Sequence, residues 1–540
     1  NLQLQPVIDE VTREDMQRFN RSELFRISVP EIKITGVDLR NAFFNKKLQI
    51  SDFNISGPEI YFENFNALRA EKEKTDLSEF YQLIFNYIED FDIRQFAISN
   101  GNLTWVNHTR RGKTTSFDNA FSASLCNFRL NETELSKKRL LFSDDFEISI
   151  RDQEFQLSDS VHVLRGSEII LSSATSSVRV KNGLLFPLIT SEKFQNLATT
   201  FQVTIPELNI KGFDFQEAWY SQEPEIESLE LISPLFQIYT RKGKAKSLDL
   251  KSYTFPMPSF VESLRLNKLK ITGGEAFTYQ TSEMGQKAQA NFRFNFLMPG
   301  IVLKSNANNQ IRVHSENIQL GILDFKAPID DVHNISVGQI NFDRKQKSIS
   351  VAELKVEPYF GGRIRNSFKI IAPRIHFAGF DLETAIEQNS FEFGQIEINN
   401  PDISIEINRK IKDDTLEFLQ TLDLYPYVEH LVNRIKIDNF NLNKAYLHFN
   451  WLEKQLFRNE LNISFKDVLL SENQPPASFL NSKEFAISTT NLATKSQNGL
   501  YEFSADSLIY NSAKHSVLLK NIEVNPLLKK EAFPQQTGFQ

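Results

Sequence analysis

Cysteine is almost absent from this chain of 540 residues, because Cys126 is the single example. One cysteine excludes an internal disulfide, so burial and hydrogen bonds have to hold the fold together. Long apolar runs are missing as well. The longest run, residues 184–189, contains a proline and falls far short of the ~18 residues that a membrane-spanning helix needs. The sequence therefore predicts no transmembrane helix within these residues.

The chain also lacks an excess of positive charge and the short motifs that mark most enzymes. Lys and Arg total 61 against 68 Asp and Glu, a net charge of -7, so no nucleic-acid partner is predicted. No nucleophile elbow, phosphate loop or zinc-binding HExxH is found. Asp330, Asp331 and His333 come nearest to a metal cluster, but they follow a proline, which indicates a solvated turn. We predict no catalytic residue, no metal site, no cofactor and no enzymatic activity.

Phenylalanine is abundant, with 47 Phe against 13 Tyr and 3 Trp, and much of it falls in a sequence written three times. The copies are FRISVPEIKITGVDL at residues 25–39, FQVTIPELNIKGFDF at 201–215 and FKIIAPRIHFAGFDL at 368–382. Each has a proline and, six residues later, a glycine. A second proline follows 28 residues after the first, at Pro58, Pro234 and Pro401. Such self-similarity indicates a repeated structural unit.

Apolar and polar residues alternate within each copy, which is typical of half-buried strands. Ile27 and Val29 are the apolar members of the first alternating run. At Pro30 the alternation shifts by one residue, and it then continues with Ile32 and Ile34 as the apolar members. Because a one-residue slip would turn the apolar set toward water, we expect a bulge or corner at these prolines and glycines. Hairpins are predicted at residues 93–105, 261–279 and 432–449, where Asn100-Gly101 and Gly273-Gly274 have turn chemistry.

Two segments break the strand pattern. Residues 77–90 and 416–431 have apolar residues at helical spacing and are predicted to be short amphipathic helices. The second repeat has only the proline-rich residues 255–260 at this place. We divide the chain into a helical or linker lead-in (1–24), three β repeats (25–188, 201–358 and 368–528) and a disordered tail (529–540). The chain begins with Asn, so we expect it to be a piece of a longer protein.

Alternation alone allows two architectures. Three separate β-sandwich domains would bury their apolar faces internally. One continuous, strongly curved sheet with an apolar concave side fits the pattern as well, because stacked units that each need a neighbour form solenoids. The spacers between repeats are short and partly apolar, unlike flexible linkers. The repeats also lack a core Trp or Cys pair, and both features favour the continuous sheet.

The openings of the type VPEIKITGVDL, with ISNGNLTW and LKITGGEAFTY, resemble the AsmA-like, TamB-related proteins of Gram-negative envelopes. The resemblance covers residues 25–528. It implies an all-β fold: an elongated, curved, continuous antiparallel sheet, or repeating β-groove, made of three homologous repeats with two short helices. It further implies a periplasmic or envelope protein that carries phospholipid acyl chains between inner and outer membranes, or serves outer-membrane biogenesis. An inner-membrane anchor outside this chain and an outer-membrane protein partner are implied as well.

The groove would bind phospholipid as its ligand, and its lining would consist of the apolar positions that recur in the repeats. These candidates are Ile27, Val29, Ile32, Ile34, Phe53, Ile55, Ile60, Val203, Ile205, Leu208, Ile210, Leu229, Leu231, Phe236, Ile370, Ile375, Phe377, Ile396, Ile398 and Ile403. The alternative function is a periplasmic or surface β-repeat scaffold or adhesion module that binds protein or glycan. An exposed apolar trough would favour the first function, and closed cores the second.

Overall fold

Hydrogen bonding joins the 28 described strands into one sheet, so the predicted continuous all-β fold is confirmed. This computed structural model describes all of the chain except residue 1 and residues 7–10, 19–22, 66–87, 110–111, 132, 135–138, 157–160, 189–196, 222–224, 242–262, 283–284, 306–310, 316, 330–331, 360–365, 383, 386–389, 408–432, 452–453, 472–481, 497–499 and 528–540. The predicted tail at 529–540 lies outside the described residues.

The elements follow the three repeats in order. The lead-in and first repeat contain β1 (Leu2–Leu4), α1 (Arg13–Arg18), β2 (Glu23–Val29), β3 (Glu31–Thr35), α2 (Leu39–Asn45), β4 (Lys47–Ser56), β5 (Glu59–Asn64), β6 (Asp90–Thr109), β7 (Gly112–Leu130), η1 (Leu140–Phe142), β8 (Asp145–Gln156), β9 (His162–Ser172) and β10 (Ser177–Pro187). The second contains β11 (Thr199–Lys211), α5 (Phe215–Ser221), β12 (Glu225–Ile226), β13 (Ser228–Ile232), β14 (Leu235–Arg241), β15 (Ser263–Ser282), β16 (Gly285–Ser305), β17 (Ile311–His314), β18 (Gln319–Pro328), β19 (His333–Asp343) and β20 (Ser348–Pro358). The third contains β21 (Asn366–Ala378), β22 (Ser390–Asn399), β23 (Asp402–Ile407), β24 (Arg434–Trp451), β25 (Lys454–Ser471), β26 (Glu484–Lys495), β27 (Tyr501–Asn511) and β28 (Ser516–Pro526).

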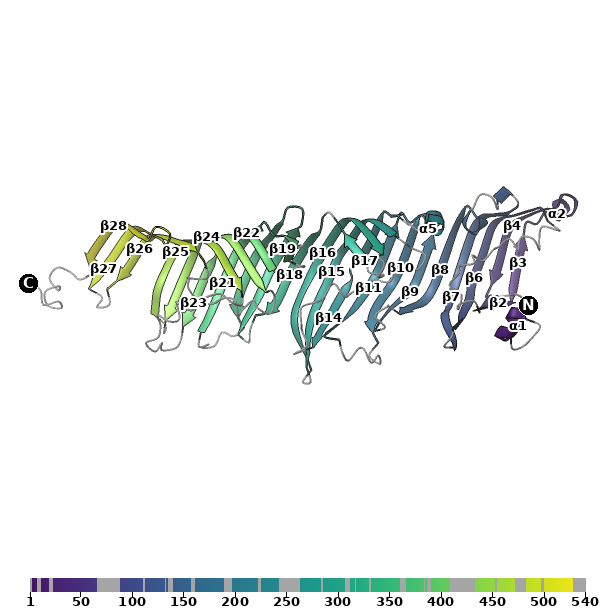
Figure 1. Ribbon diagram of the computed structural model, residues 1–540, viewed down its shortest axis with the longest axis horizontal. Coiled ribbons are helices and arrows are strands. Elements are labelled where there is room, and N and C mark those ends of the chain that lie inside the picture. Colours follow the sequence, from purple (N-terminus) through teal and green to yellow (C-terminus); the bar gives the residue numbers. More distant parts are fainter. Residues whose placement is uncertain are drawn as a thin grey trace, which may run out of the picture. The chain divides into compact units, whose positions relative to one another are not determined.

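Contacts between residues divide the chain into two compact units. Unit 1 comprises Asn1–Tyr239, Leu248–Gly274 and Met298–Ser315, and unit 2 comprises Thr240–Ser247, Glu275–Leu297 and Glu316–Gln540. The boundary passes through β15 and β16, inside the second repeat. Within unit 1, β6 to β10 are joined in chain order by antiparallel pairs, as Figure 1 shows. In unit 2, β18 to β21 are joined in the same way.

The sheet is mixed rather than purely antiparallel, and this corrects one part of the expected fold. β4 and β5 run parallel to β6, β12 and β13 run parallel to β15, and β22 and β23 run parallel to β24. Parallel neighbours need a crossover of a dozen or more residues. The helices predicted at 77–90 and 416–431 fall almost entirely in these crossovers, at residues 66–87 and 408–432, which lie outside the described residues.

The three copies have the same strand register. Ile34 is opposite Phe53 in the first copy, Ile210 is opposite Leu229 in the second, and Phe377 is opposite Ile396 in the third. The residue before the second proline has a left-handed backbone in all three, with φ of 61° at Gly57, 49° at Ser233 and 52° at Asn400. The sequence repeat is therefore a repeat of strand pairing within the sheet.

The hairpins predicted inside 93–105, 261–279 and 432–449 are wrong. Residues 93–105, 263–279 and 434–449 each belong to one long strand, β6, β15 or β24, which is interrupted by a residue with left-handed φ: 51° at Asn100, 64° at Gly273 and 50° at Lys444. The register shifts between Ile98 and Gly101 in β6, so Asn100 forms a β-bulge rather than a turn. Similar left-handed residues lie within other strands: Asp152, Asn182, Asp324, Glu353, Asn491 and Asn521.

Candidate functional site

An unbroken row of apolar side chains crosses ten strands of unit 1. Residues directly opposite each other in a ladder present their side chains on the same face of the sheet. Each member of this row is opposite the next, from β3 to β15, and we call the set the unit 1 row: Ile32, Ile55, Ile98, Ala123, Ile148, Leu171, Val178, Ile210, Leu229 and Leu269.

Unit 2 carries a similar row across eleven strands, from β16 to β28. We call it the unit 2 row: Phe294, Ile322, Ile340, Val351, Ile375, Ile398, Leu442, Ile463, Ile487, Tyr510 and Val517. Because strands lie about 4.8 Å apart, a row of ten strands measures about 43 Å along the sheet. One leaflet of a bilayer has a hydrocarbon layer of about 15 Å, so a row exceeds the length of an acyl chain.

The bulges keep the apolar face continuous along each strand. Ile98 and Leu103 lie on either side of Asn100 and are five residues apart, an odd spacing that would put them on opposite faces of a regular strand. The extra residue of the bulge restores them to one face. Leu103 is opposite Ile60, which is in turn opposite Ile27, so a shorter apolar row lies beyond the bulge. At Asn100 the bulge therefore compensates for a shift in the alternation of the sequence.

Side chains of the unit 1 row are only partly covered. None of its ten members is buried, and Ile32 at the edge is 39% exposed. Two packed sheets would bury such a row in a core. The unit 2 row is better covered, since Val351, Ile375 and Leu442 are buried. One reason is Phe380, which follows Gly379 and stacks on Phe393 at a centroid distance of 5.3 Å, within the cluster that also contains Val351 and Ile375.

The structure places the predicted lining residues in three groups. On the two rows lie Ile32, Ile55, Ile210, Leu229, Ile375 and Ile398; two residues away along the same strands are the opposite pairs Ile34–Phe53, Leu208–Leu231 and Phe377–Ile396. Beyond the bulges, Ile27 is opposite Ile60 and Ile370 is opposite Ile403, while Phe236 lies in β14. Val29, Val203, Ile205, Ile375 and Ile396 are buried, so their surface is already covered by the protein.

The opposite face of the sheet is charged, with signs that alternate between strands. Arg151, Glu168, Lys181 and Glu207 follow one another as opposite residues on β8 to β11. Lys181 Nζ donates to Glu168 Oε2 at 2.8 Å, and this hydrogen bond, with a second from Ser149, holds the pKa of Glu168 below its usual value. The two faces of the sheet therefore differ sharply in polarity.

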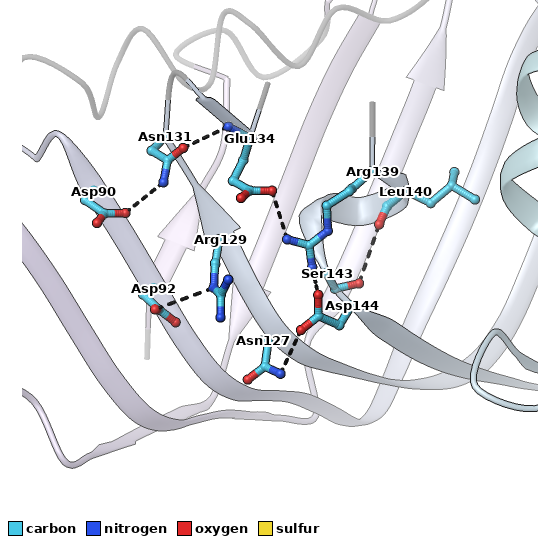
Figure 2. A network of polar contacts seen from close by, with 10 residues as sticks. All are labelled: Asp90, Asp92, Asn127, Arg129, Asn131, Glu134, Arg139, Leu140, Ser143 and Asp144. Carbon is cyan, nitrogen blue, oxygen red and sulfur yellow. Dashed lines mark hydrogen bonds and ion pairs between the residues drawn. The ribbon is translucent and has the colours of Figure 1, made fainter. Parts of the chain in front are cut away.

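Two polar clusters lie outside this pattern, and no motif in the sequence indicates either of them. Glu63 is 2% exposed; its Oε1 accepts from Arg26 Nη1 at 3.2 Å, and its Oε2 lies 2.6 Å from His108 Nε2. Figure 2 shows the second cluster, in which Arg139 bridges Glu134 and Asp144 at the ends of β7 and β8. In both clusters the acidic groups contact basic side chains of other segments, an arrangement that joins strand ends to one another.

No arrangement for metal chemistry is found in the described part of the chain, where no three His, Cys, Asp or Glu side chains come together as ligands. Among the helices that the structure describes, none is both long and apolar enough to cross a membrane. The two rows form apolar surfaces on the sheet. Such a surface takes apolar groups out of water without selecting ligands of a particular shape.

Comparisons with known proteins add little to this picture. No protein-family model matches the chain, and no curated protein matches it. A match was found to the crystal structure of a sex pheromone precursor from Lactobacillus salivarius subsp. salivarius UCC118. The match covers 51% of this chain and 68% of the precursor chain, with 10% sequence identity and a TM-score of 0.10. The features that bear on function are therefore the sheet and its apolar rows.

Proposed function

We propose that this chain binds phospholipid acyl chains along the unit 1 row and the unit 2 row. In this proposal it serves lipid transport between the inner and outer membranes of a Gram-negative envelope, or outer-membrane biogenesis. It works in the periplasm, held by an anchor outside this chain, with an outer-membrane protein as a further partner. The observation that carries the proposal is the unit 1 row, whose ten apolar side chains lie in register and none of which is buried.

The energetics favour a long apolar ligand. Exposing an acyl chain to water costs about 0.8 kcal/mol per CH₂, and an apolar row recovers much of this cost. The recovered energy depends on area alone, so the binding discriminates poorly between headgroups and the lipid is free to shift along the row. This combination suits transport better than storage, because no single strong polar contact has to break as the lipid moves.

The test measures lipid on the purified chain. We expect phospholipid to be extracted from the wild-type protein and identified by mass spectrometry. Ile210→Asp combined with Leu231→Asp places two carboxylates on the apolar face of neighbouring strands. Burying an unpaired charge beside an acyl chain is costly, so the lipid bound per folded chain should fall about tenfold or more.

A matched control uses the same region of the sheet. Ser177→Asp with Ser228→Asp also adds two carboxylates, but on the opposite face, where both positions are opposite Lys211. This control should retain its lipid. Circular dichroism and the denaturation midpoint verify that each variant is folded. If the wild-type chain never carries lipid, or if both double variants lose it equally, the proposal fails.

A further inference from the structure

The three repeats differ at one place on the apolar face of the sheet. A left-handed residue interrupts the third-last strand of each repeat: Asp152 in β8, Asp324 in β18 and Asn491 in β26. The residue that follows is Phe325 in the second repeat and Leu492 in the third, but Gln153 in the first. The first repeat therefore has a carboxamide where the other two have an apolar side chain.

The two strands that follow β8 differ from their counterparts as well. Apolar residues occupy three consecutive opposite positions in the later repeats: Phe325, Val337 and Leu354 in the second, and Leu492, Ala505 and Ile522 in the third. In the first repeat Gln153 is opposite Gly166, and the third position is Gly183, which follows the left-handed Asn182. Gln153 is therefore the one side chain that the first repeat keeps at these positions, and it is polar.

Gln153 lies on the apolar face of β8. Its neighbour Glu154 is opposite Arg165 and forms an ion pair with it, and both side chains are about half exposed. Because successive residues of a strand point to opposite faces, Gln153 and Phe155 project from the other face. Phe155 is opposite Leu164, so the carboxamide lies next to apolar side chains of its own face.

The position of Gly166 shows that this place adjoins the unit 1 row. A Cβ added to Gly166 would lie 3.1 Å from Val180 Cγ1 and 3.4 Å from Ile169 Cγ1. Ile169 and Val180 are opposite each other, and each lies two residues along its strand from a member of the unit 1 row. An acyl chain bound along the row would therefore pass next to the carboxamide opposite Gly166.

The carboxamide of Gln153 has an oxygen that the protein does not satisfy. Gln153 is 4% exposed, and its Nε2 donates to the backbone oxygen of Glu154 at 2.7 Å. Its Oε1 is buried too, and no group in the described part of the chain donates a hydrogen bond to it. A buried carbonyl oxygen without a donor is unfavourable, because it has given up its hydrogen bonds to water. A donor carried by a ligand would remove this cost.

The surroundings of the oxygen limit what the donor can be. The hydrocarbon of an ordinary acyl chain has no O–H or N–H group, and a polar headgroup stays in water at the margin of an apolar surface. Gln153 lies among apolar side chains, so the donor has to be carried on the acyl chain itself. A hydroxyl meets both conditions, since it donates one hydrogen bond and adds a single heavy atom to the chain.

We propose that Gln153 selects acyl chains that carry a hydroxyl group, whose O–H donates to Gln153 Oε1. The inference rests on the proposed function, because it requires an acyl chain on the apolar face of unit 1. Rotation about the side-chain bonds of Gln153 turns the carboxamide toward the bound chain. Because the lipid is free to shift along the row, hydroxyl groups at different positions on the chain can reach this oxygen.

Two fatty acids of equal length test the proposal: stearic acid and its mid-chain hydroxy derivative. Isothermal titration calorimetry measures the Kd of each for the full chain, and the ratio of the two Kd values is the readout. A hydroxyl that enters an apolar face without a partner loses its hydrogen bonds to water. We therefore expect the wild type to bind the hydroxy acid at least as tightly as stearic acid, and Gln153→Leu to bind it about tenfold more weakly.

The variants are chosen to keep the fold. Leu492 occupies the counterpart position in the third repeat, and Gln153→Met, which keeps the length of the side chain, is a second variant. The matched control is Gln202→Leu in β11. Gln202 is next to Val203, which shares the face of Gln153, so Gln202 lies on the opposite face and its variant should keep the wild-type ratio. Hydrogen exchange locates the contact, because the hydroxy acid should protect β8 and β9 more than stearic acid does.

Each other outcome contradicts the inference in a distinct way. If the wild type binds both acids but prefers stearic acid, or if both Gln153 variants keep its ratio, the inference is wrong and the proposed function stands. A loss in Gln153→Leu that is equal for both acids, or an equal change of ratio in Gln202→Leu, also overturns it. If the wild type binds neither acid, the proposed function and the inference fall together.

Discussion

The carboxylate of Glu63 is buried, and each of its two oxygens contacts a side chain from another strand. Arg26 and His108 hold its two oxygens, and the ring of His108 stacks on Phe65 at 3.8 Å. Burial is also the main cause that raises the pKa of the neighbouring Tyr61, and the charge of Glu63 adds to it. Arg26 lies in β2 and His108 in β6, so the carboxylate of Glu63 in β5 links three strands.

Removing Glu63 should destabilise unit 1. Glu63→Ala leaves Arg26 and His108 facing a vacated carboxylate position. We expect a loss of about 2 kcal/mol in the free energy of unfolding, lower than for a fully buried pair because Arg26 is 37% exposed. Urea denaturation measures the loss, and hydrogen exchange in β5 locates it. The control is Glu59→Ala on the same strand, which should change stability by less than about 0.5 kcal/mol. Equal effects would show that the buried contacts contribute nothing.

Stability should also depend on pH through the charged face. Hydrogen bonds from Lys181 and Ser149 lower the pKa of Glu168. Because the folded pKa lies below the unfolded one, this stabilisation is complete above the unfolded value near 4.5 and disappears as pH falls through the folded pKa. Both side chains are partly exposed to solvent, 45% for Lys181 and 30% for Glu168, so the contribution is about 0.5 kcal/mol.

This dependence is measured with Glu168→Gln. The variant should be less stable than the wild type at pH 6 and nearly equal to it at pH 3, by urea midpoint. Glu502→Gln on β27 removes the same charge and serves as the control. A stability difference for Glu168→Gln that is unchanged between the two pH values would contradict the assignment.

The bulged strands were predictable from the sequence only in part. The phase slip at Pro30 predicted a bulge or corner correctly, since alternation reports directly on facing. Asn100-Gly101 predicts a hairpin turn, and this prediction is wrong because tight turns and bulges both need a left-handed residue, which Asn and Gly supply. Local chemistry could not distinguish them. The length of the apolar pattern on both sides of Asn100 was the available signal for a single strand.

The parallel pairs were missed for a different reason. A long segment between two strands, such as residues 65–89, is what a parallel crossover requires. The predicted helix there was a sign of the crossover, yet sequence alone does not say which strand the chain rejoins. The contacts of Glu63 were beyond prediction because Arg26 is 37 residues away and His108 is 45 residues away. The equivalent strand positions of the repeated apolar residues, by contrast, followed from the repeat itself.

The bulge at Asn100 can be tested by substitution. Its φ of 51° suits Asn and Gly, whereas a β-branched residue is strained there. Asn100→Val should lower the free energy of unfolding by about 1–2 kcal/mol, while Asn100→Gly should be close to neutral. Thermal denaturation compares the two. If valine is tolerated as well as glycine, the bulge is not the conformation that holds β6 on its face.

The three copies explain how 28 described strands can join into one sheet. Each strand is hydrogen-bonded only to strands beside it, and both repeat junctions use the same pairing, β10 with β11 and β20 with β21. Stability in such an array is a sum over neighbours rather than a property of one central core. The apolar rows follow from the same repetition, because each copy places its apolar residues in the same register.

Because both junctions use the same strand pairing, whole repeats can be removed or added. A chain shortened by residues 199–365, which run from the start of β11 to just before β21, would bring β10 directly to β21. These two edges already match, since Val178 and Ile349 occupy equivalent places and so do Ile210 and Phe377. Proteins of this design can change their span in whole-repeat steps during evolution without inventing a new interface at each step.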